Sequence, residues 1–470
     1  MIDTKKAKVR FLSLAFRGKL VDYPRKENRN DSLDIIHKIQ KNYQAVSDTE
    51  QLIDIPSHWH WSRLGYVTSN HGQTVPNKDF CYIDVGTLDN VHQKLAEAEN
   101  LVAAKDAPTR ARKIVHFGDV LYSTVRPYLH NICIVDREFS RTPIASTAFC
   151  VMQVKDSVLL NKYLFYWLLT AEFDRYTNGD PSKGALYPAI GEKDLLRGVI
   201  PLPSVEEQTL IVDKIEAAFS ALDTIDALQM QYADNLTVLK SKLINAAIQG
   251  KLTEQLPEDG TAEELYQQVQ AERKRQEDAG TIKSVELAAD VTEADWPFAI
   301  PSTWKWTHLG NVSYIVRGGS PRPIKQYITT REDGINWIKI GDVEKGGKYI
   351  YSTHEKIIPE GEAKSRRVYP GDFLLTNSMS FGRPYISKIE GCIHDGWLLI
   401  HGLNGFDPDY LYYLLSSTFL YGQFTVKASG STVDNLNIDK VKAAIIPLPP
   451  LAEQKRIAQK IDELTPIFER

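Results

Sequence analysis

Basic residues lie in corresponding loops and at corresponding strand ends in the two halves of this 470-residue chain. Lysine and arginine at such positions suit contacts with phosphate oxygens, and hydroxyl or aromatic neighbours add further polar and ring contacts. The first set is Lys105, Arg110, Arg112, Lys113, Arg126, Tyr128 and Lys183. The second set is Arg317, Ser320, Arg322, Lys325, Lys364, Arg366, Arg367, Arg383, Tyr385 and Lys427. Any one such residue is more often a solvated surface charge, so the prediction of two anion-binding surfaces rests on their paired placement.

The composition predicts a globular protein with neither a membrane segment nor a wholly basic surface. The formal net charge is −4, so any anion-binding surface must be a local patch. No apolar run reaches the about 18 residues that indicate a membrane span, and the N-terminus lacks the apolar core of a signal peptide. We therefore expect a cytoplasmic chain that makes no membrane contact.

The sequence carries no motif that indicates a metal site or a catalytic centre. Its four cysteines form no C-x-x-C pair, which predicts buried thiols and no zinc site, and they are Cys81, Cys133, Cys150 and Cys392. There is no G-x-x-x-x-G-K-[ST] loop for nucleotide phosphates and no Asn-Pro-Pro-aromatic tetrapeptide of the kind found in DNA amino-methyltransferases. The adjacent pair His394 and Asp395 is interpreted as structural. We expect no catalytic residue, no metal and no bound cofactor, although scattered acidic residues leave a nuclease centre open.

Sequence blocks of the first half recur in the second half, about 250 residues later and in the same order. "DIPSHWHWSRLGYV" at 54–67 matches "AIPSTWKWTHLGNV" at 299–312. "VIPLPSVEEQ" at 199–208 likewise matches "IIPLPPLAEQ" at 445–454. The Arg-Pro-Tyr triplets that begin at Arg126 and Arg383 also align. The chain is therefore a duplication, with short insertions in its loops.

Each repeat is predicted to form a mixed domain, because short β-rich runs alternate with glycine and proline punctuation and with helical blocks. The Gly-Lys-Leu at 18–20 corresponds to the one at 250–252, so the repeat is circularly arranged. The predicted fold class is α+β, with two similar mixed α/β domains, long antiparallel spacer helices and a pseudo-two-fold axis. The predicted segments are an N-terminal helical segment completing the distal region (1–50), the first domain (51–203), the central helical region (204–290), the second domain (291–449) and the distal helix (450–470).

The central region is predicted to form one long amphipathic helix, because no proline or glycine occurs between Ser204 and Gly250. Ser204 and Glu207 have the capping-box spacing, and Gly250 supplies a stop. At about 1.5 Å per residue, the helix would extend for roughly 65–70 Å. The apolar stripe is predicted to pack as the core of a coiled-coil spacer or subunit interface, and its members here and on the last helix are Ile211, Ile215, Leu222, Leu236, Leu239, Leu243, Ile457 and Ile461.

In these features the chain resembles the specificity subunits of type I restriction–modification enzymes. The resemblance covers essentially the whole chain. It is carried by "PLPSVEEQ" from Pro201, "PLPPLAEQKRIAQKID" from Pro447, "AIQGKL" from Ala247, "IPSTWKW" from Ile300 and "RGGSPRP" from Arg317. It implies two target-recognition domains that each read one half of a bipartite, gapped DNA site, and helices that space them and dock two methylation subunits.

The resemblance also implies which partners carry the chemistry. The expected partners are double-stranded DNA, two methylation (M) subunits and restriction (R) subunits. S-adenosylmethionine, ATP and Mg are expected on those subunits, so this chain would be non-catalytic and would direct adenine methylation and DNA cleavage. Two alternatives remain open: a specificity subunit of a type IIB or related restriction system, and a protein-binding scaffold that contacts no DNA.

Overall fold

The structure is a computed structural model that describes residues 1–21, 37, 43–178, 189–344, 346–377, 382–425 and 436–468. It contains two compact units, Met1–Gln231 and Tyr232–Arg470. The predicted site residues Lys183 and Lys427 lie outside the described residues. No helix in the described part has the length and apolar content that crossing a membrane requires. The cysteines are buried free thiols.

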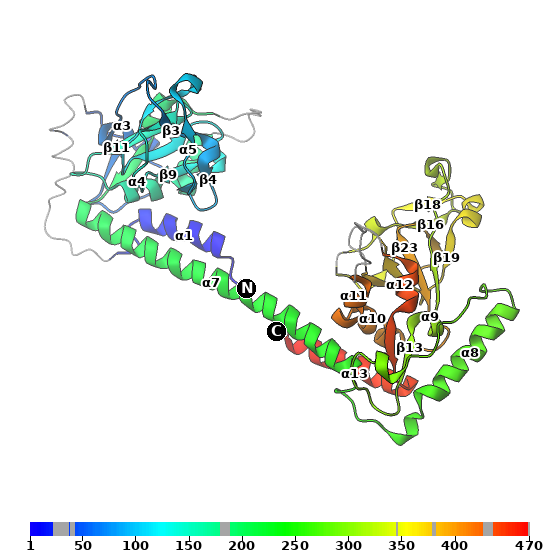
Figure 1. Ribbon diagram of the computed structural model, residues 1–470. Helices are drawn as coiled ribbons and strands as arrows, with labels where there is room; N and C mark the ends of the chain where they lie inside the picture. Colours follow the sequence, from blue (N-terminus) through cyan, green and yellow to red (C-terminus); the bar gives the residue numbers. More distant parts are fainter. Residues whose placement is uncertain are drawn as a thin grey trace. The chain divides into compact units, whose positions relative to one another are not determined.

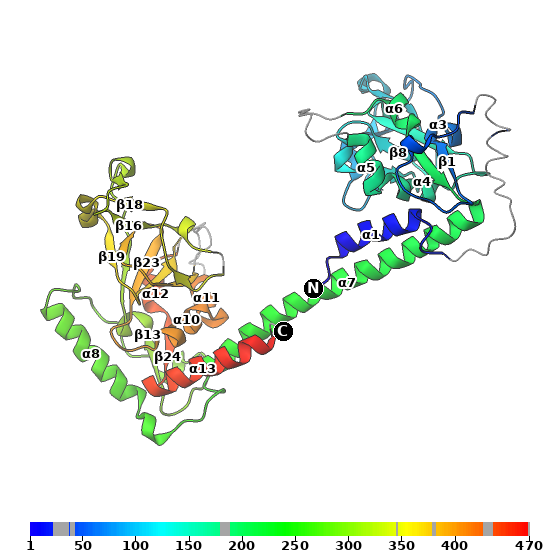
Figure 2. The same ribbon diagram turned by 180° about the vertical axis from the view of Figure 1, so that it is seen from behind.

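The described part of the first unit contains two four-stranded sheets and two separate strand pairs (Figures 1 and 2). One sheet has the order β6 (Leu101–Val102), β3 (Phe80–Ile83), β10 (Pro143–Ser146) and β7 (Ala111–Ile114). The other has the order β2 (Thr68–Ser69), β11 (Phe149–Val154), β8 (Val120–Ser123) and β9 (Ile132–Ile134). The pairs are β1 (His60–Arg63) with β12 (Val199–Leu202), and β4 (Leu88–Asp89) with β5 (Lys94–Leu95). The helices are α1 (Thr4–Phe16), α3 (Leu64–Val67), α4 (Asn161–Leu168), α5 (Ala171–Asn178), α6 (Glu192–Arg197) and the first part of α7 (Val205–Ile248).

The described part of the second unit contains two five-stranded sheets and one strand pair. One sheet has the order β14 (Tyr314–Arg317), β23 (Trp397–His401), β20 (Phe373–Thr376), β21 (Pro384–Ser387) and β17 (Tyr349–Ile350). The other has the order β15 (Ile328–Thr329), β18 (Glu355–Ile357), β16 (Ile335–Ile338), β22 (Gly391–Ile393) and β19 (Arg366–Val368). The pair is β13 (Lys305–His308) with β24 (Ile445–Leu448). Besides the second part of α7, the helices are α8 (Ala262–Asp278), α9 (Leu309–Val312), α10 (Pro408–Ser416), α11 (Thr418–Thr425), α12 (Ile438–Ala443) and α13 (Leu451–Phe468).

Both units contain the same mixed arrangement of strands. In the first, β10 pairs parallel with β3 and antiparallel with β7. In the second, β22 pairs parallel with β16 and antiparallel with β19. Strands β8 and β20 each lie between two antiparallel neighbours. The predicted pair of similar mixed α/β domains with a helical spacer is therefore confirmed.

Each domain meets its helix at the same junction. Strands β12 and β24 carry Pro201 and Pro447 in two-stranded sheets, where proline is tolerated because each strand has a neighbouring strand on one edge only, among the described residues. The carbonyl of Pro201 accepts the hydroxyl of Tyr163 at 3.0 Å, and that of Pro447 accepts the hydroxyl of Tyr410 at 3.1 Å. The duplicated sequence pattern therefore marks a duplicated structural junction.

The first turn of the following helix is anchored by a buried glutamate. Glu207 of α7 accepts Trp59 Nε1–H at 3.0 Å, and Glu453 of α13 accepts Trp304 Nε1–H at 2.8 Å. The predicted capping box is half formed, because the Ser204 hydroxyl accepts the Glu207 N–H at 3.2 Å while the Glu207 carboxylate binds the tryptophan. The next residue, Gln208 or Gln454, is wholly buried, and each accepts one backbone N–H and donates to two backbone carbonyls.

The ends of α1 and α7 are also equivalent. Both are followed by a glycine with left-handed backbone, Gly18 at φ +66° and Gly250 at φ +70°. A Cβ atom would lie 2.3 Å from Pro56 Cγ at Gly18 and 2.5 Å from Pro301 Cγ at Gly250, so both helix ends require glycine. Helix α1 thus has the place in the first unit that the end of α7 has in the second, which agrees with a circular repeat.

A terminal helix flanks α7 in each unit (Figures 1 and 2). Helix α1 runs antiparallel to the first part of α7, since the Ile2 N–H donates to Gln229 and Lys8 pairs with Asp223. In the second unit, α13 shares one apolar core with the end of α7. Each unit therefore packs its domain on a pair of helices.

The predicted apolar stripe of α7 is only partly a core. Its buried members are Ile211 and Ile215, with Ile457 and Ile461 on α13. Its half-buried members are Leu222, Leu236 and Leu243. Leu239, however, is 41% exposed, and its exposed apolar neighbours are Leu228, Met230, Tyr232 and Val238. Core packing within the chain therefore does not extend along the whole stripe, because α1 begins opposite Gln229 and does not cover the middle of α7. The subunit-interface part of the prediction stays a prediction.

Candidate nucleic-acid interface

A basic loop of the second unit, residues 317–325, is organised by one carboxylate. Asp395 Oδ1 accepts the Ser320 hydroxyl at 2.8 Å, and Oδ2 accepts Arg322 at 3.2 Å. The Asp395 carbonyl accepts Arg317 Nε–H at 3.1 Å. Three of the predicted contact residues are therefore brought together by Asp395, two by its carboxylate and Arg317 by its main-chain carbonyl. The adjacent pair of His394 and Asp395 had been interpreted as structural.

Two glycines let this loop approach its neighbours closely. A Cβ on Gly318 would lie 2.1 Å from the carbonyl oxygen of His394, and one on Gly319 would lie 2.8 Å from that of Lys364. Both distances are shorter than side-chain carbons tolerate, so the Gly-Gly pair allows this packing. The loop therefore lies against both the segment before β19 and the turn before β23, and these three segments are together called the basic face.

A hollow of about 660 Å³ lies beside the loop. Its lining includes Ser320, Arg322, Trp337, Lys339 and His394. Trp337 is a buried aromatic residue of this lining, and Lys339 forms an ion pair with Glu355. Sequence reasoning missed Lys339, although it lies two residues after Trp337, the spacing that places side chains on one face of an extended strand.

Two neighbouring groups of this face, His394 and Asp395, have lowered pKa values. Burial lowers the pKa of His394, and the nearby Asp395 carboxylate opposes this shift without cancelling it. Burial raises the pKa of Asp395, but hydrogen bonds led by that of Ser320 outweigh it, and the pKa lies below its ordinary value. At neutral pH the imidazole is neutral and the carboxylate ionised, so the positive charge of the loop comes from its arginines and Lys325.

The basic residues around β19 have different environments. Lys325 and Arg366 are exposed. Lys364 donates to the Tyr327 hydroxyl at 2.6 Å and lies over its ring. Arg367 bridges Glu390 at 2.6 Å and Glu362 at 3.3 Å. Lys364 and Arg366 therefore fit a phosphate-facing role better than Arg367, whose charge is already matched by two carboxylates.

The Arg-Pro-Tyr triplets do not occupy equivalent places. Tyr385 lies on β21, pairs with Leu374 of β20 and is only 3% exposed. Its side chain therefore belongs to the core and does not fit a DNA contact. Its counterpart in strand register is Cys133, which pairs with Leu121. Tyr128 is exposed in a turn between β8 and β9 that follows Arg126, itself exposed with left-handed backbone. Arg383, before β21, is half-buried.

The basic residues of the first unit lie around β7. Lys105 and Arg110 are exposed, and Arg112 is half-buried. Lys113 is buried, and its ammonium pairs with Glu192 at 2.6 Å. Lys113 therefore does not fit a phosphate contact, because a carboxylate already neutralises it inside the domain.

The family model for the type I restriction modification DNA specificity domain matches the chain twice, over residues 56–230 and 301–469. The specificity subunit of the Escherichia coli type I restriction enzyme EcoEI is 22% identical to this chain, over 98% of this chain and 88% of that protein. The EcoDI specificity subunit of the same species is 24% identical, over 56% of this chain and 59% of that protein, so the chain spans less than two thirds of that relative.

Solved structures show the same fold. The HsdS subunit from Thermoanaerobacter tengcongensis superimposes with a TM-score of 0.56 at 23% identity, covering 90% of this chain and 92% of that one. A chain from a study of complex assembly in the type I R-M system gives a TM-score of 0.62 at 24% identity, covering 89% and 92%. The two family matches span most of the chain, and the protein belongs to the family of type I restriction–modification DNA specificity subunits.

Proposed function

We propose that this chain is the DNA-specificity subunit of a type I restriction–modification complex and binds a bipartite, gapped DNA site. The observation that carries the proposal is that the family domain occurs twice, on equivalent junctions of the helical spacer. Duplex DNA has two-fold symmetry in its backbone, so two similar domains can meet two half-sites with equivalent faces. Because the contact loops of the two domains differ in sequence, the two half-sites should differ as well.

The exposed apolar residues in the middle of α7 support docking of partner subunits on the spacer. Leu228, Met230 and Tyr232 are each at least half exposed, which is unusual for apolar side chains gathered on one helix. We assign this stretch to contact with two methylation subunits, with restriction subunits joining that core. S-adenosylmethionine, ATP and Mg would be bound by those subunits. A subunit that reads cellular DNA in this way would act in the cytoplasm.

This chain would itself be non-catalytic. Support comes from its sequence, which lacks the phosphate-binding loop of nucleotide-driven motors and the tetrapeptide of amino-methyltransferases. The adjacent His394 and Asp395 resemble a catalytic pair, but Asp395 holds the basic loop in place, and the His394 ring contacts the backbone N–H groups of Ile340 and Gly396. The chain would direct adenine methylation and cleavage through the position in which it holds DNA.

Mapping of methylated adenines tests the function directly. The chain is co-expressed with its methylation partners in a host without other adenine methylation, and the genome is sequenced with a modification-sensitive method. A single bipartite motif with a fixed gap is expected. An intact purified complex that leaves no motif would rule the proposal out. Purification of a complex with a different restriction architecture would favour a type IIB-like system.

Replacing Arg322 by alanine is expected to weaken DNA binding and its salt dependence. If the guanidinium contacts one phosphate, the slope of log K against log salt should fall in magnitude by about 0.9. The measurement is fluorescence anisotropy of the methylation complex on its mapped site at several salt concentrations. The control is Arg275→Ala, which removes an exposed, ion-paired arginine of α8 outside the basic loop. Equal slopes for both variants and the wild type would exclude Arg322 as a phosphate contact, and a protein scaffold would show no salt-dependent DNA binding at all.

A further inference from the structure

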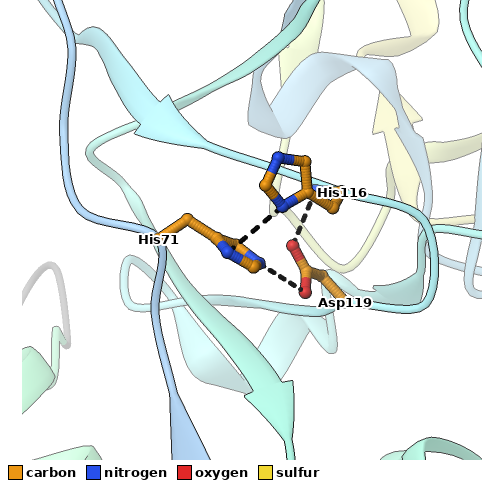
Figure 3. Close-up of side chains that lie close together, drawn as sticks. All are labelled: His71, His116 and Asp119. Atoms are coloured by element: carbon orange, nitrogen blue, oxygen red, sulfur yellow. Dashed lines mark hydrogen bonds and ion pairs between the residues drawn. The ribbon is translucent and has the colours of Figure 1, made fainter.

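Two histidines and an aspartate converge in the first unit, and none of them is among the residues predicted to contact DNA (Figure 3). His71 follows β2, and His116 and Asp119 lie in the turn between β7 and β8. His71 Nε2 is 3.1 Å from Asp119 Oδ1, and His71 Nδ1 is 3.1 Å from His116 Nδ1. Among the described residues, this is the one group of three or more such side chains close enough to hold a metal ion.

The donor set and its spacing suit a divalent transition metal. Each of the three side chains offers one ligand atom, and these atoms lie within 4.8 Å of one another. Ligand atoms of tetrahedral zinc lie about 3.4 Å apart, because zinc–nitrogen and zinc–oxygen bonds are about 2.0–2.2 Å long. Imidazole and carboxylate ligands match the preference of Zn²⁺, Co²⁺ and Ni²⁺. We propose that His71, His116 and Asp119 bind one divalent metal ion of this class.

The equivalent turn of the second unit holds a similar histidine–aspartate pair, although its histidine comes from β23 and His71 follows β2. In the second unit, Asp372 accepts the Tyr369 N–H at 2.8 Å and binds His401 Nδ1 at 2.8 Å. In the first unit, Asp119 likewise accepts the His116 N–H at 2.7 Å and binds His71. A histidine–aspartate pair is thus common to both domains. The second imidazole is particular to the first, because His116 occupies the place of Tyr369.

Burial and charge favour the ion at this place. The Asp119 side chain is 2% exposed and that of His71 is 14% exposed, so two ligands are already held in the domain and largely desolvated. His116 is exposed and leaves an approach from solvent. One carboxylate and two neutral imidazoles would leave a divalent ion with a single net positive charge. Ligation uses one nitrogen of His71, so metal binding would replace one of the two present contacts of this ring.

The ion would cross-link the segment after His71 to the turn that follows β7, the strand that carries Arg112. The segment after His71 pairs with β7, where the Thr74 N–H donates to the Arg112 carbonyl at 2.8 Å and the Ile114 N–H donates to the Gly72 carbonyl at 3.3 Å. A metal bond between His71 and the β7–β8 turn would close a covalent-like link around this pairing. The expectation of no metal rested on the spacing of the cysteines. That spacing says nothing about His71 and His116, which are 45 residues apart in the chain.

Cobalt titration of the full-length chain tests the proposal. The chain, free of any histidine tag and stripped of metal by a chelator, is titrated with CoCl₂ and then with ZnCl₂. One Co²⁺ per chain, with visible d–d absorption that Zn²⁺ displaces, is expected, together with a higher melting temperature in Zn²⁺. Absence of stoichiometric binding to the wild-type chain would overturn the proposal.

Variants then locate the ion. His116→Tyr places the residue of the second unit at this position, and it should abolish the cobalt absorption and the zinc-induced rise in melting temperature. His401→Ala, which disrupts the histidine–aspartate pair of the second unit, should leave both signals intact. Circular dichroism of the metal-free variants reports whether each is folded. Cobalt absorption that survives His116→Tyr, or disappears only with His401→Ala, would place the ion elsewhere and refute the assignment.

Discussion

Deletion of residues 230–236 from α7 is expected to abolish methylation at the wild-type motif and, where binding persists, to shorten its gap by about three base pairs. Seven helical residues extend for about 10 Å, and B-DNA rises about 3.4 Å per base pair. A heptad is within about 20° of two full helical turns, so the deletion changes length far more than orientation. The mapped motif of the deletion variant is the measurement.

The place of the deletion keeps its cost to packing small. Residues 230–235 are exposed and Leu236 is half-buried, so little core is removed. The matched control replaces the same seven residues by alanine and glutamate, which keeps the helix length and removes the exposed apolar surface. An unchanged gap in the deletion variant would refute a spacer that sets the gap. Loss of methylation subunits from the length-preserving variant would instead identify this stretch as their docking surface.

Replacement of Gln454 by leucine is expected to destabilise the second unit by about 3 kcal/mol or more, because it leaves three buried polar groups unpaired at a cost of about 1–3 kcal/mol each. The side chain is wholly buried and accepts the Asp407 N–H at 2.9 Å. It also donates to the carbonyls of Gly405 at 3.1 Å and Pro449 at 3.0 Å. Leucine is close in size but satisfies none of these groups.

Hydrogen exchange distinguishes a local effect from a general one. Gln454→Leu should lower protection in β24 and α13, and the equivalent Gln208→Leu should lower it in β12 and the start of α7. The control is Gln459→Leu, at an exposed position of α13 that has little effect on packing. If Gln454→Leu proves as stable as Gln459→Leu, the junction is not held by these hydrogen bonds.

The architecture could be predicted because the duplicated residues are the ones that build it. Glu207 and Glu453 recur with their tryptophan partners, and Gly18 and Gly250 recur at helix ends that no other residue fits. Such local patterns specify caps, turns and junctions directly, so two copies in one order define the repeat. The stripe on α7 was misread as core because periodicity reports a helix face without saying what covers it.

Individual contact residues were harder to predict, because their environment depends on distant parts of the chain. The sequence around Lys113 shows no sign of Glu192, which neutralises it from 79 residues away. Tyr385 was paired with Tyr128 by a shared triplet, yet strand register decides which side chains face the core. Asp395 organises residues about 75 positions earlier, a contact that only the folded sheets bring together.

The two junctions also have a genetic consequence. On the helix side, both use a Glu-Gln pair, and the Gln amide of each contacts only main-chain groups of the domain. A domain exchanged between these points would meet the same bonding groups whatever its contact loops contain. Recombination with breakpoints at the Pro-Leu-Pro segments would therefore leave each domain whole and exchange the specificity for one half-site at a time, while breakpoints inside a domain would separate loops from the strands that hold them.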